Sequence, residues 1–309
     1  MLINFILFAI FLFCLIKTAD WSIKYSTMIA ESLNLSKFVV GYIIVAIISI
    51  LPEAFISITA ALDGVPELGL GTLFGSNVAD LTFVIAMIVF FSGRSLKIES
   101  KIIKNAWLQI AIMIVPLLLG ADGSFTRLEG MVLLVAGFVF YYITLRGSAS
   151  EIKSIERKFH IKSLILLIVS MSALLLSAKL TVDYAVYLAS DLKISPLFIG
   201  MFLVAIGTTL PELMFSLKAA RRNHDSLAIG DILGTVTADA TIVVGILAVV
   251  TPFVFPQKLV FITGGFMLLS TFILFRFMKS GKEISKQEGF LLLALYLVFV
   301  ITEIFFSKF

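Results

Sequence analysis

The stretch from Gly200 to Glu212 reads GMFLVAIGTTLPE, and an earlier stretch, from Gly41 to Glu53, reads GYIIVAIISILPE. The two copies lie 159 positions apart. Each copy places a proline and then a glutamate inside a strongly apolar segment. A carboxylate deep in a membrane helix costs about 2.5–3.5 kcal/mol, so a functional role is the default interpretation. The repeat therefore predicts a membrane protein made of two related halves, each with a buried acid.

The prolines predict a break in each of the two helices. Pro52 and Pro211 have no N–H, and their rings crowd the preceding turn, so carbonyls near Ile48 and Gly207 are expected to lose their helical partners. Carbonyl oxygens beside a carboxylate are suitable ligands for a hard cation. Two such places, related by an internal repeat, indicate a transporter.

The composition supports the membrane assignment. Of the 309 residues, 60% are hydrophobic and only 14% are charged, and the mean hydropathy is +1.10. Soluble domains are about half apolar and about a quarter charged, so this is an integral membrane protein. The single cysteine, Cys14, excludes an intrachain disulfide and a thiolate metal cluster. His160 and His224 lie near charged loops, which argues against a zinc or haem site, and we expect no organic cofactor.

The fold predicted from hydropathy is an all-α membrane protein with ten transmembrane helices, at about 20 residues per crossing. The segments cover residues 2–30, 37–61, 67–92, 102–119, 127–145, 162–189, 195–219, 226–251, 258–277 and 287–306. The first and sixth segments are longer than a bilayer requires and should be tilted. Since five helices per half is an odd number, the halves form two inverted-topology repeats.

The same reasoning divides the chain into three parts. Residues 1–146 form the first five-helix repeat, residues 147–161 form a polar cytoplasmic linker, and residues 162–309 form the second repeat. With both termini extracellular, 17 of the 24 lysines and arginines fall in cytoplasmic loops. Positive charge accumulates on the cytoplasmic side of membrane proteins, so this orientation is predicted for a multi-pass protein of the cytoplasmic membrane. Because the basic residues cluster at helix ends, the net charge of +4 does not indicate nucleic-acid binding.

The repeat also contains a second acid in each half. At the same offset of 159, Asp80 matches Asp239, and a glycine-rich entry precedes both. No lysine or arginine lies at matching depth in the segments that carry these aspartates and the glutamates Glu53 and Glu212. Four carboxylates cannot all stay ionised around one divalent ion, so at least one should be protonated or matched by another cation.

Hydroxyl groups are expected to complete the ligand shell. The candidates are Ser49 and Ser76 from the first half and Thr208, Thr209, Thr235 and Thr237 from the second. The alternative for each is a hydrogen bond to the preceding helical turn, which is common for Ser and Thr in membrane helices. Oxygen ligands without His or Cys fit Ca2+ or Na+ better than zinc or copper.

At these residues the sequence resembles the cation/calcium antiporter superfamily, and within it the prokaryotic sodium/calcium exchangers. Gly207–Glu212, GTTLPE, is similar to the G-T-S-x-P-E segment of that family, and Gly75–Asp80, GSNVAD, is similar to its G-S-N-x-x-D/N segment. The resemblance covers nearly the whole chain. It implies Ca2+ export across the cytoplasmic membrane in exchange for Na+ by alternating access, with the two glutamates shared between the two ions.

The chain departs from the family pattern on the first-half side. Ile48 and Ile50 stand where the family has a glycine and a hydroxyl, and Asp80 stands where some sodium-coupled members have Asn. In the second half, Thr235 and Thr237 replace the usual Ser and Asn. The first-half side is thus more acidic and poorer in neutral oxygens. Coupling to protons or K+ therefore stays open as an alternative to Na+.

Two other classes of function fit the sequence less well. An intramembrane aspartyl protease would use two membrane aspartates and the Gly230-Asp231 step, but it would not need a mirrored pair of Pro-Glu breaks. A passive cation channel more often gains its symmetry from subunits than from an inverted repeat. We therefore expect a non-enzymatic antiporter, monomeric, whose partners are inorganic cations and the lipid bilayer.

Overall fold

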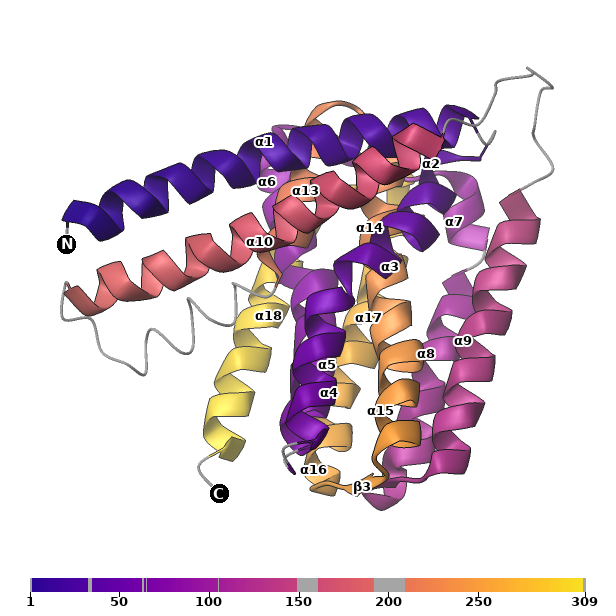
Figure 1. Cartoon of the computed structure of the whole chain (residues 1–309). Coiled ribbons are helices and arrows are strands. Elements are labelled where there is room, and N and C mark those ends of the chain that lie inside the picture. The colour runs from indigo at the N-terminus through magenta and orange to yellow at the C-terminus, as the bar shows by residue number, and fades with distance from the viewer. Residues whose placement is uncertain are drawn as a thin grey trace.

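The structure is a computed structural model and describes residues 2–32, 35–62, 64, 66–104, 106–148, 161–191 and 209–307. These residues are almost all helical (Figure 1). Within the described part, seven helices are long and apolar enough to cross a membrane, and two shorter apolar helices cover Lys37–Ser49 and Ala106–Asp122. The predicted class, an all-α membrane protein, is confirmed. The count of ten stays a prediction, because most of the segment expected at 195–219 lies outside the described residues.

The first half begins with a long helix and continues through several interrupted ones. Its elements are α1 (Leu2–Ser32), α2 (Lys37–Val39), the π-helical turn η1 (Val40–Val45), α3 (Ala46–Ser49), α4 (Leu51–Leu62), α5 (Pro66–Ala79), the π-helical turn η2 (Asp80–Val84), α6 (Ile85–Ser92), β1 (Leu96–Lys97), α7 (Ser100–Lys104), α8 (Ala106–Leu119), the 3-10 turn η3 (Gly120–Asp122), β2 (Ser124–Phe125) and α9 (Arg127–Ser148).

The second half repeats this order. Its elements are α10 (Ile161–Asp191), α13 (Leu210–Arg221), α14 (Asp225–Ala238), the π-helical turn η6 (Asp239–Val243), α15 (Val244–Val250), β3 (Phe253–Val254), α16 (Gln257–Leu259), the π-helical turn η7 (Val260–Gly264), α17 (Gly265–Gly281), β4 (Glu283–Ile284) and α18 (Lys286–Ser307). Six pairs of elements begin and end 159 positions apart, namely α1 and α10, α4 and α13, α5 and α14, η2 and η6, β2 and β4, and α9 and α18.

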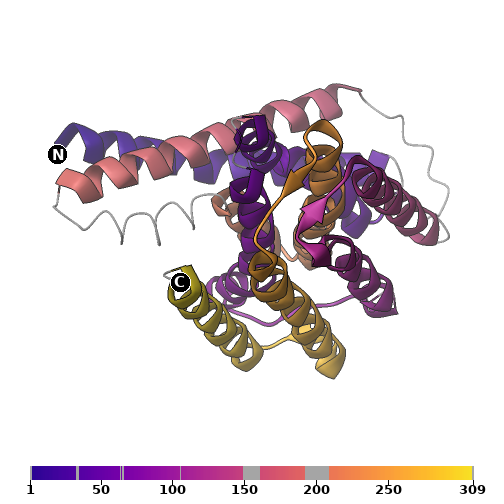
Figure 2. The ribbon, with the colours of Figure 1, turned by 90° about the horizontal axis from the view of Figure 1, so that it is seen from below.

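The long helices α1 and α10 lie side by side outside the bundle of the other helices, and they cross it at a steep slant (Figures 1 and 2). They run antiparallel, since Asn4 near the start of α1 donates to Asp191 at the end of α10, at 2.7 Å. Near the middle of the contact, the Ser22 hydroxyl donates to that of Ser170 at 3.2 Å. Their buried apolar side chains form a cluster with η1, α13 and α14, separate from the main core.

Two short antiparallel strand pairs connect the halves. Strand β1 pairs with β4, and β2 pairs with β3, so each pair takes one strand from each repeat. Each pair holds the two halves together, and the side chains of Leu96, Ile284, Phe125 and Phe253 are part of the main apolar core.

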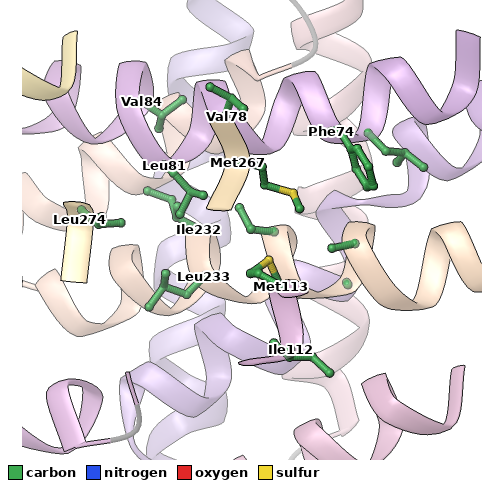
Figure 3. Packing of buried hydrophobic residues seen from close by; sticks show 14 of the residues in the cluster. Phe74, Val78, Leu81, Val84, Ile112, Met113, Ile232, Leu233, Met267 and Leu274 are labelled. Carbon is green, nitrogen blue, oxygen red and sulfur yellow. The ribbon is translucent and has the colours of Figure 1, made fainter. Parts of the chain in front are cut away.

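The main core packs helices of both halves against each other (Figure 3). Phe74, Val78 and Leu81 of α5 and η2 face Met267 of α17 and Ile232 of α14, and all five side chains are fully buried. The helix α14 is therefore held inside the protein, and its polar residues are enclosed with it.

Backbone contacts of α14 with α2 and η1 are unusually close, and glycines make them possible. A Cβ on Gly230 would lie 2.3 Å from the Phe38 carbonyl oxygen, and one on Gly234 would lie 2.2 Å from that of Tyr42. From the other side, a Cβ on Gly41 would lie 2.4 Å from the Leu227 carbonyl oxygen. Small residues allow helix backbones to approach in this way. A first-half segment is thus fixed directly against a second-half helix.

Candidate cation site

The two glutamates of the repeated motif are buried in the first turns of their helices. Helix α3 ends at Ser49, Ile50 forms a turn with ψ of −8°, and α4 begins at Leu51. In the second half, Thr209 lies outside the helix with φ of −93° and ψ of 1°, and α13 begins at the next residue. Each proline thus lies in the first turn of a helix, where backbone N–H groups have no helical acceptor, so the N–H that proline lacks costs no hydrogen bond. Glu53 and Glu212 follow directly, with 3% and 2% of their surfaces exposed.

The two aspartates of the motif each begin a π-helical turn. Asp80 is the first residue of η2 and Asp239 is the first residue of η6. Both side chains are buried, with 1% and 0% exposure. Single π-helical turns within α-helices are rare and frequently occur at functional sites. The two halves place an acid at the same irregularity of the backbone.

The four acids interact electrostatically across the halves. Glu212 lies within Coulombic range of Glu53 and Asp80, and Asp239 lies within range of the same two groups. Buried carboxylate oxygens without a hydrogen-bond partner among the described residues are Oε2 of Glu53, Oδ1 of Asp80, and both oxygens of Glu212 and of Asp239. Within the described part of the chain, none of the four forms an ion pair. Buried acids in this state require a cation or protons.

The hydroxyl candidates differ in the contacts that they make. The hydroxyls of Ser49 and Thr235 lie 3.1 Å apart and connect the two halves, and the Ser49 hydroxyl also lies 3.2 Å from the Ala46 carbonyl oxygen of its own preceding turn. Ser76 donates to the Leu73 carbonyl at 3.1 Å, which is the back-bonded arrangement. Thr209 is buried with 2% exposure at the start of α13. Thr208 lies outside the described residues.

A polar network behind the site was not predicted from the sequence. The Tyr42 hydroxyl lies 2.6 Å from the Thr237 hydroxyl and donates to Oε1 of Gln109 at 2.8 Å. Gln109 also donates to the Thr237 hydroxyl at 2.6 Å. Thr237 is thus engaged by η1 and α8 and positions α14. A buried glutamine in the apolar segment 102–119 was the signal available in the sequence.

A fifth buried acid, Asp231 of α14, was also missed as a site residue. Its side chain is fully buried and accepts a hydrogen bond from Ser216 of α13 at 3.0 Å. It lies within Coulombic range of Asp80 and Glu212. The sequence signal was the replacement of Thr72, its counterpart in the first repeat, by an acid.

No group of three or more His, Cys, Asp or Glu side chains within the described ranges is close enough together to hold a metal ion. Hydroxyl and carbonyl oxygens would have to supply the other ligands of a bound cation, as hard cations in proteins generally require.

A repeated helix architecture with buried acids at corresponding helix starts and π-helical turns, without basic partners among the described residues, defines a membrane transporter for cations. The family model for the sodium/calcium exchanger protein matches residues 3–146 and 162–305. The chain therefore belongs to the sodium/calcium exchanger family, and the resemblance seen in the sequence is confirmed. Its named relatives are exchangers, a class of transporter.

Relatives and solved structures agree with this assignment. The chain is 32% identical over 285 residues to an uncharacterized membrane protein of Methanocaldococcus jannaschii, covering 91% of each chain. It is 25% identical to the sodium/calcium exchanger MaX1 of Methanosarcina acetivorans, covering 97% of this chain and 98% of that protein. The structure of the sodium-calcium exchanger NCX_Mj soaked with 10 mM Na+ and zero Ca2+ matches with a TM-score of 0.83 and 29% identity, over 96% of this chain and 97% of that chain.

Proposed function

We propose that this protein exports Ca2+ across the cytoplasmic membrane in exchange for Na+ by alternating access. The observation that carries the proposal is the set of four buried acids, two from each repeat, whose carboxylates lack a basic partner among the described residues. Fixed negative charge in an apolar surrounding attracts cations and is stabilised by them. The names of its exchanger relatives support Na+ and Ca2+ as the transported ions.

The ions bind between two five-helix repeats of opposite orientation. The first repeat covers residues 1–146, the cytoplasmic linker covers 147–161, and the second repeat covers 162–309. Both termini face the extracellular side. The element bounds offset by 159 positions and the antiparallel contact of α1 with α10 support this arrangement, and repeat interfaces are where transporters of this kind bind their substrates.

The ligand set combines acids and hydroxyls from both repeats. Glu53 and Glu212 bind either Ca2+ or Na+ in competing occupancies, with Asp80 and Asp239 beside them. The neutral ligands are Ser49, Ser76, Thr208, Thr209 and Thr235. Ile50 supplies no side-chain oxygen on the first-half side, so the best Na+ site lies by Glu212.

Alternating access requires an element that moves relative to the ion-binding bundle. Helices α1 and α10 are suited to this, because they lie outside the bundle and carry none of the proposed ligands. Ligands drive such a movement only through different affinities for the two states.

Proton coupling is the second candidate. Asp80 favours proton coupling, as does Ile50, which stands where the family has a hydroxyl. A carboxylate can take a proton at a place where a neutral oxygen would bind Na+. In this alternative Asp80 exchanges a proton with the solvent while Ca2+ moves in the opposite direction, and K+ assists in a related variant.

The deciding experiment is 45Ca2+ uptake into proteoliposomes under separate Na+, K+ and H+ gradients. We expect uphill Ca2+ movement with an imposed Na+ gradient, and its loss in Glu212→Gln and Glu53→Gln. Glu129→Gln is the matched control, since Glu129 is exposed at the start of α9, where glutamine also caps a helix. If only a proton gradient drives Ca2+ flux, the protein is coupled to protons and not to Na+. Downhill flux alone would exclude an antiporter.

A further inference from the structure

Helix α14 carries oxygen-bearing side chains at intervals of four residues. Asp231, Thr235 and Asp239 follow one another along one face, about 6 Å apart along the helix axis per step. The helix begins at Asp225, whose carboxylate is held by both terminal nitrogens of the Arg94 guanidinium at 2.7 and 2.6 Å. Asp231 therefore lies about 9 Å along the axis from this surface ion pair, on the way to the proposed site.

The surroundings of Asp231 are those of a carboxylate that lacks its counterion. One oxygen, Oδ2, receives the Ser216 hydroxyl at 3.0 Å, whereas Oδ1 has no hydrogen-bond partner in the described residues. The nearby charges are negative, because Glu212 and Asp80 are within Coulombic range. One hydroxyl donor does not offset the cost of burying a carboxylate, so the group requires a proton or a cation.

The first repeat shows that Asp231 is not needed to build the scaffold. Ser216 donates to the Ala228 carbonyl at 3.2 Å, and its counterpart Ser57 donates to the Gly69 carbonyl at 3.3 Å. The packing of α13 on α14 is thus repeated in the packing of α4 on α5. At the place of Asp231, however, the first repeat has Thr72. The acid is a property of the second repeat alone.

We infer that Asp231 and Ser216 form an additional binding station for a divalent cation, Ca2+, on the cytoplasmic route to the proposed site. This inference rests on the proposed function and on the opposite orientation of the two repeats. In that orientation the α14 face leads from the cytoplasm and the corresponding α5 face leads from the outside. The station attracts Ca2+ from the cytoplasm, passes it along Thr235 to Asp239, and has no acidic equivalent on the outer route.

The inference is tested by the sidedness of Ca2+ affinity. Na+-dependent 45Ca2+ flux is measured in inside-out and right-side-out membrane vesicles, with Ca2+ presented at the cytoplasmic or the extracellular face. For Asp231→Asn and Asp231→Thr, the ratio of cytoplasmic to extracellular KM for Ca2+ should rise about tenfold, because a fixed negative charge on the path of the ion raises the local concentration of cations by that order. Asp231→Thr installs the residue that the other repeat carries, so folding is expected. Glu129→Gln should keep the wild-type ratio.

The mirror variant gives a second, independent measurement. Thr72→Asp should lower the KM for Ca2+ at the extracellular face and reduce the same ratio. A ratio that stays at the wild-type value in both Asp231 variants would overturn the inference, and so would a loss of flux equal on both faces, which would place Asp231 in the central site. A shifted pH profile with an unchanged ratio would assign a proton to Asp231 and also overturn it. Failure of the proposed function is distinguishable, because the wild-type protein would then show no Na+-driven Ca2+ flux.

Discussion

The contact between α14 and η1 allows one substitution, Gly234→Ala, to be followed quantitatively. The added methyl carbon would lie 2.2 Å from the Tyr42 carbonyl oxygen and 2.7 Å from the Ala46 Cβ. Ordinary contact begins at about 3.5 Å, so the two backbones must separate by more than about 1 Å. The contact is between backbone atoms, and no side-chain rotation relieves it.

The expected magnitude combines two opposing effects. Overpacking of a tight interface typically costs about 1–3 kcal/mol, whereas replacing a helical glycine by alanine gains about 0.5–1 kcal/mol. The free energy of unfolding should therefore fall by about 1–2 kcal/mol. The same separation would lengthen the Ser49–Thr235 hydroxyl contact from 3.1 Å to beyond hydrogen-bonding range, so ion affinity should fall with it.

The assay is thermal unfolding of the detergent-solubilised protein together with 45Ca2+ exchange in proteoliposomes. Gly265→Ala of α17 is the matched control, since it makes the same change in a helix where a Cβ meets nothing within 4 Å. We expect the control to be as stable as the wild type or more so, and fully active. If Gly234→Ala unfolds at the same temperature as the control and exchanges equally well, the close approach of η1 to α14 does not hold the site together and the reasoning fails.

Three further predictions follow from the site and its surroundings. Thr209→Ala should weaken Na+ coupling, while Ile50→Ser should raise the number of Na+ ions exchanged per Ca2+; reversal of these effects in stoichiometry measurements would reject the assignment of the better Na+ site to Glu212. A covalent cross-link between α1 and η1 should stop exchange but leave equilibrium Ca2+ binding intact, and unimpaired transport would show that α1 does not move. Burial, supplemented by the charge of Lys37, lowers the pKa of His224 below its ordinary value. As the pH falls, the unfolded state therefore binds a proton at this histidine before the folded state does, and the stability of the fold should decrease between about pH 7.5 and about pH 5.5. Thermal unfolding of His224→Gln should lack this pH dependence.

The sequence predicted much of the fold because hydropathy and repeat spacing are local signals. The segments expected at 2–30, 127–145, 162–189 and 287–306 correspond to α1, α9, α10 and α18 within three residues at each end. The helix breaks were predicted from Pro52 and Pro211. At Pro52 the structure shows the form of the break, because α3 ends at Ser49 and α4 begins at Leu51, whereas at Pro211 the described residues resume at Thr209, one residue before α13.

The π-helical turns at Asp80 and Asp239 had no recognised sequence signal. One extra residue in a helical turn changes neither the hydropathy nor the spacing of a short segment. Likewise, no repeat comparison could show that Thr237 binds Tyr42 and Gln109, since those partners come from separate segments of the first half.

The sequence by itself determined the membrane class, the two halves and the identity of four of the buried acids. A charged residue inside an apolar segment can be recognised from the sequence alone, because the free energy of burying it in a membrane depends on the residues next to it in the chain. The tertiary structure decided which groups meet: Ser49 with Thr235, Asp231 with Ser216, and η1 with the glycine face of α14. These contacts depend on the packing of helices that are distant in the chain, and only the folded arrangement brings their oxygens within a few ångströms of each other.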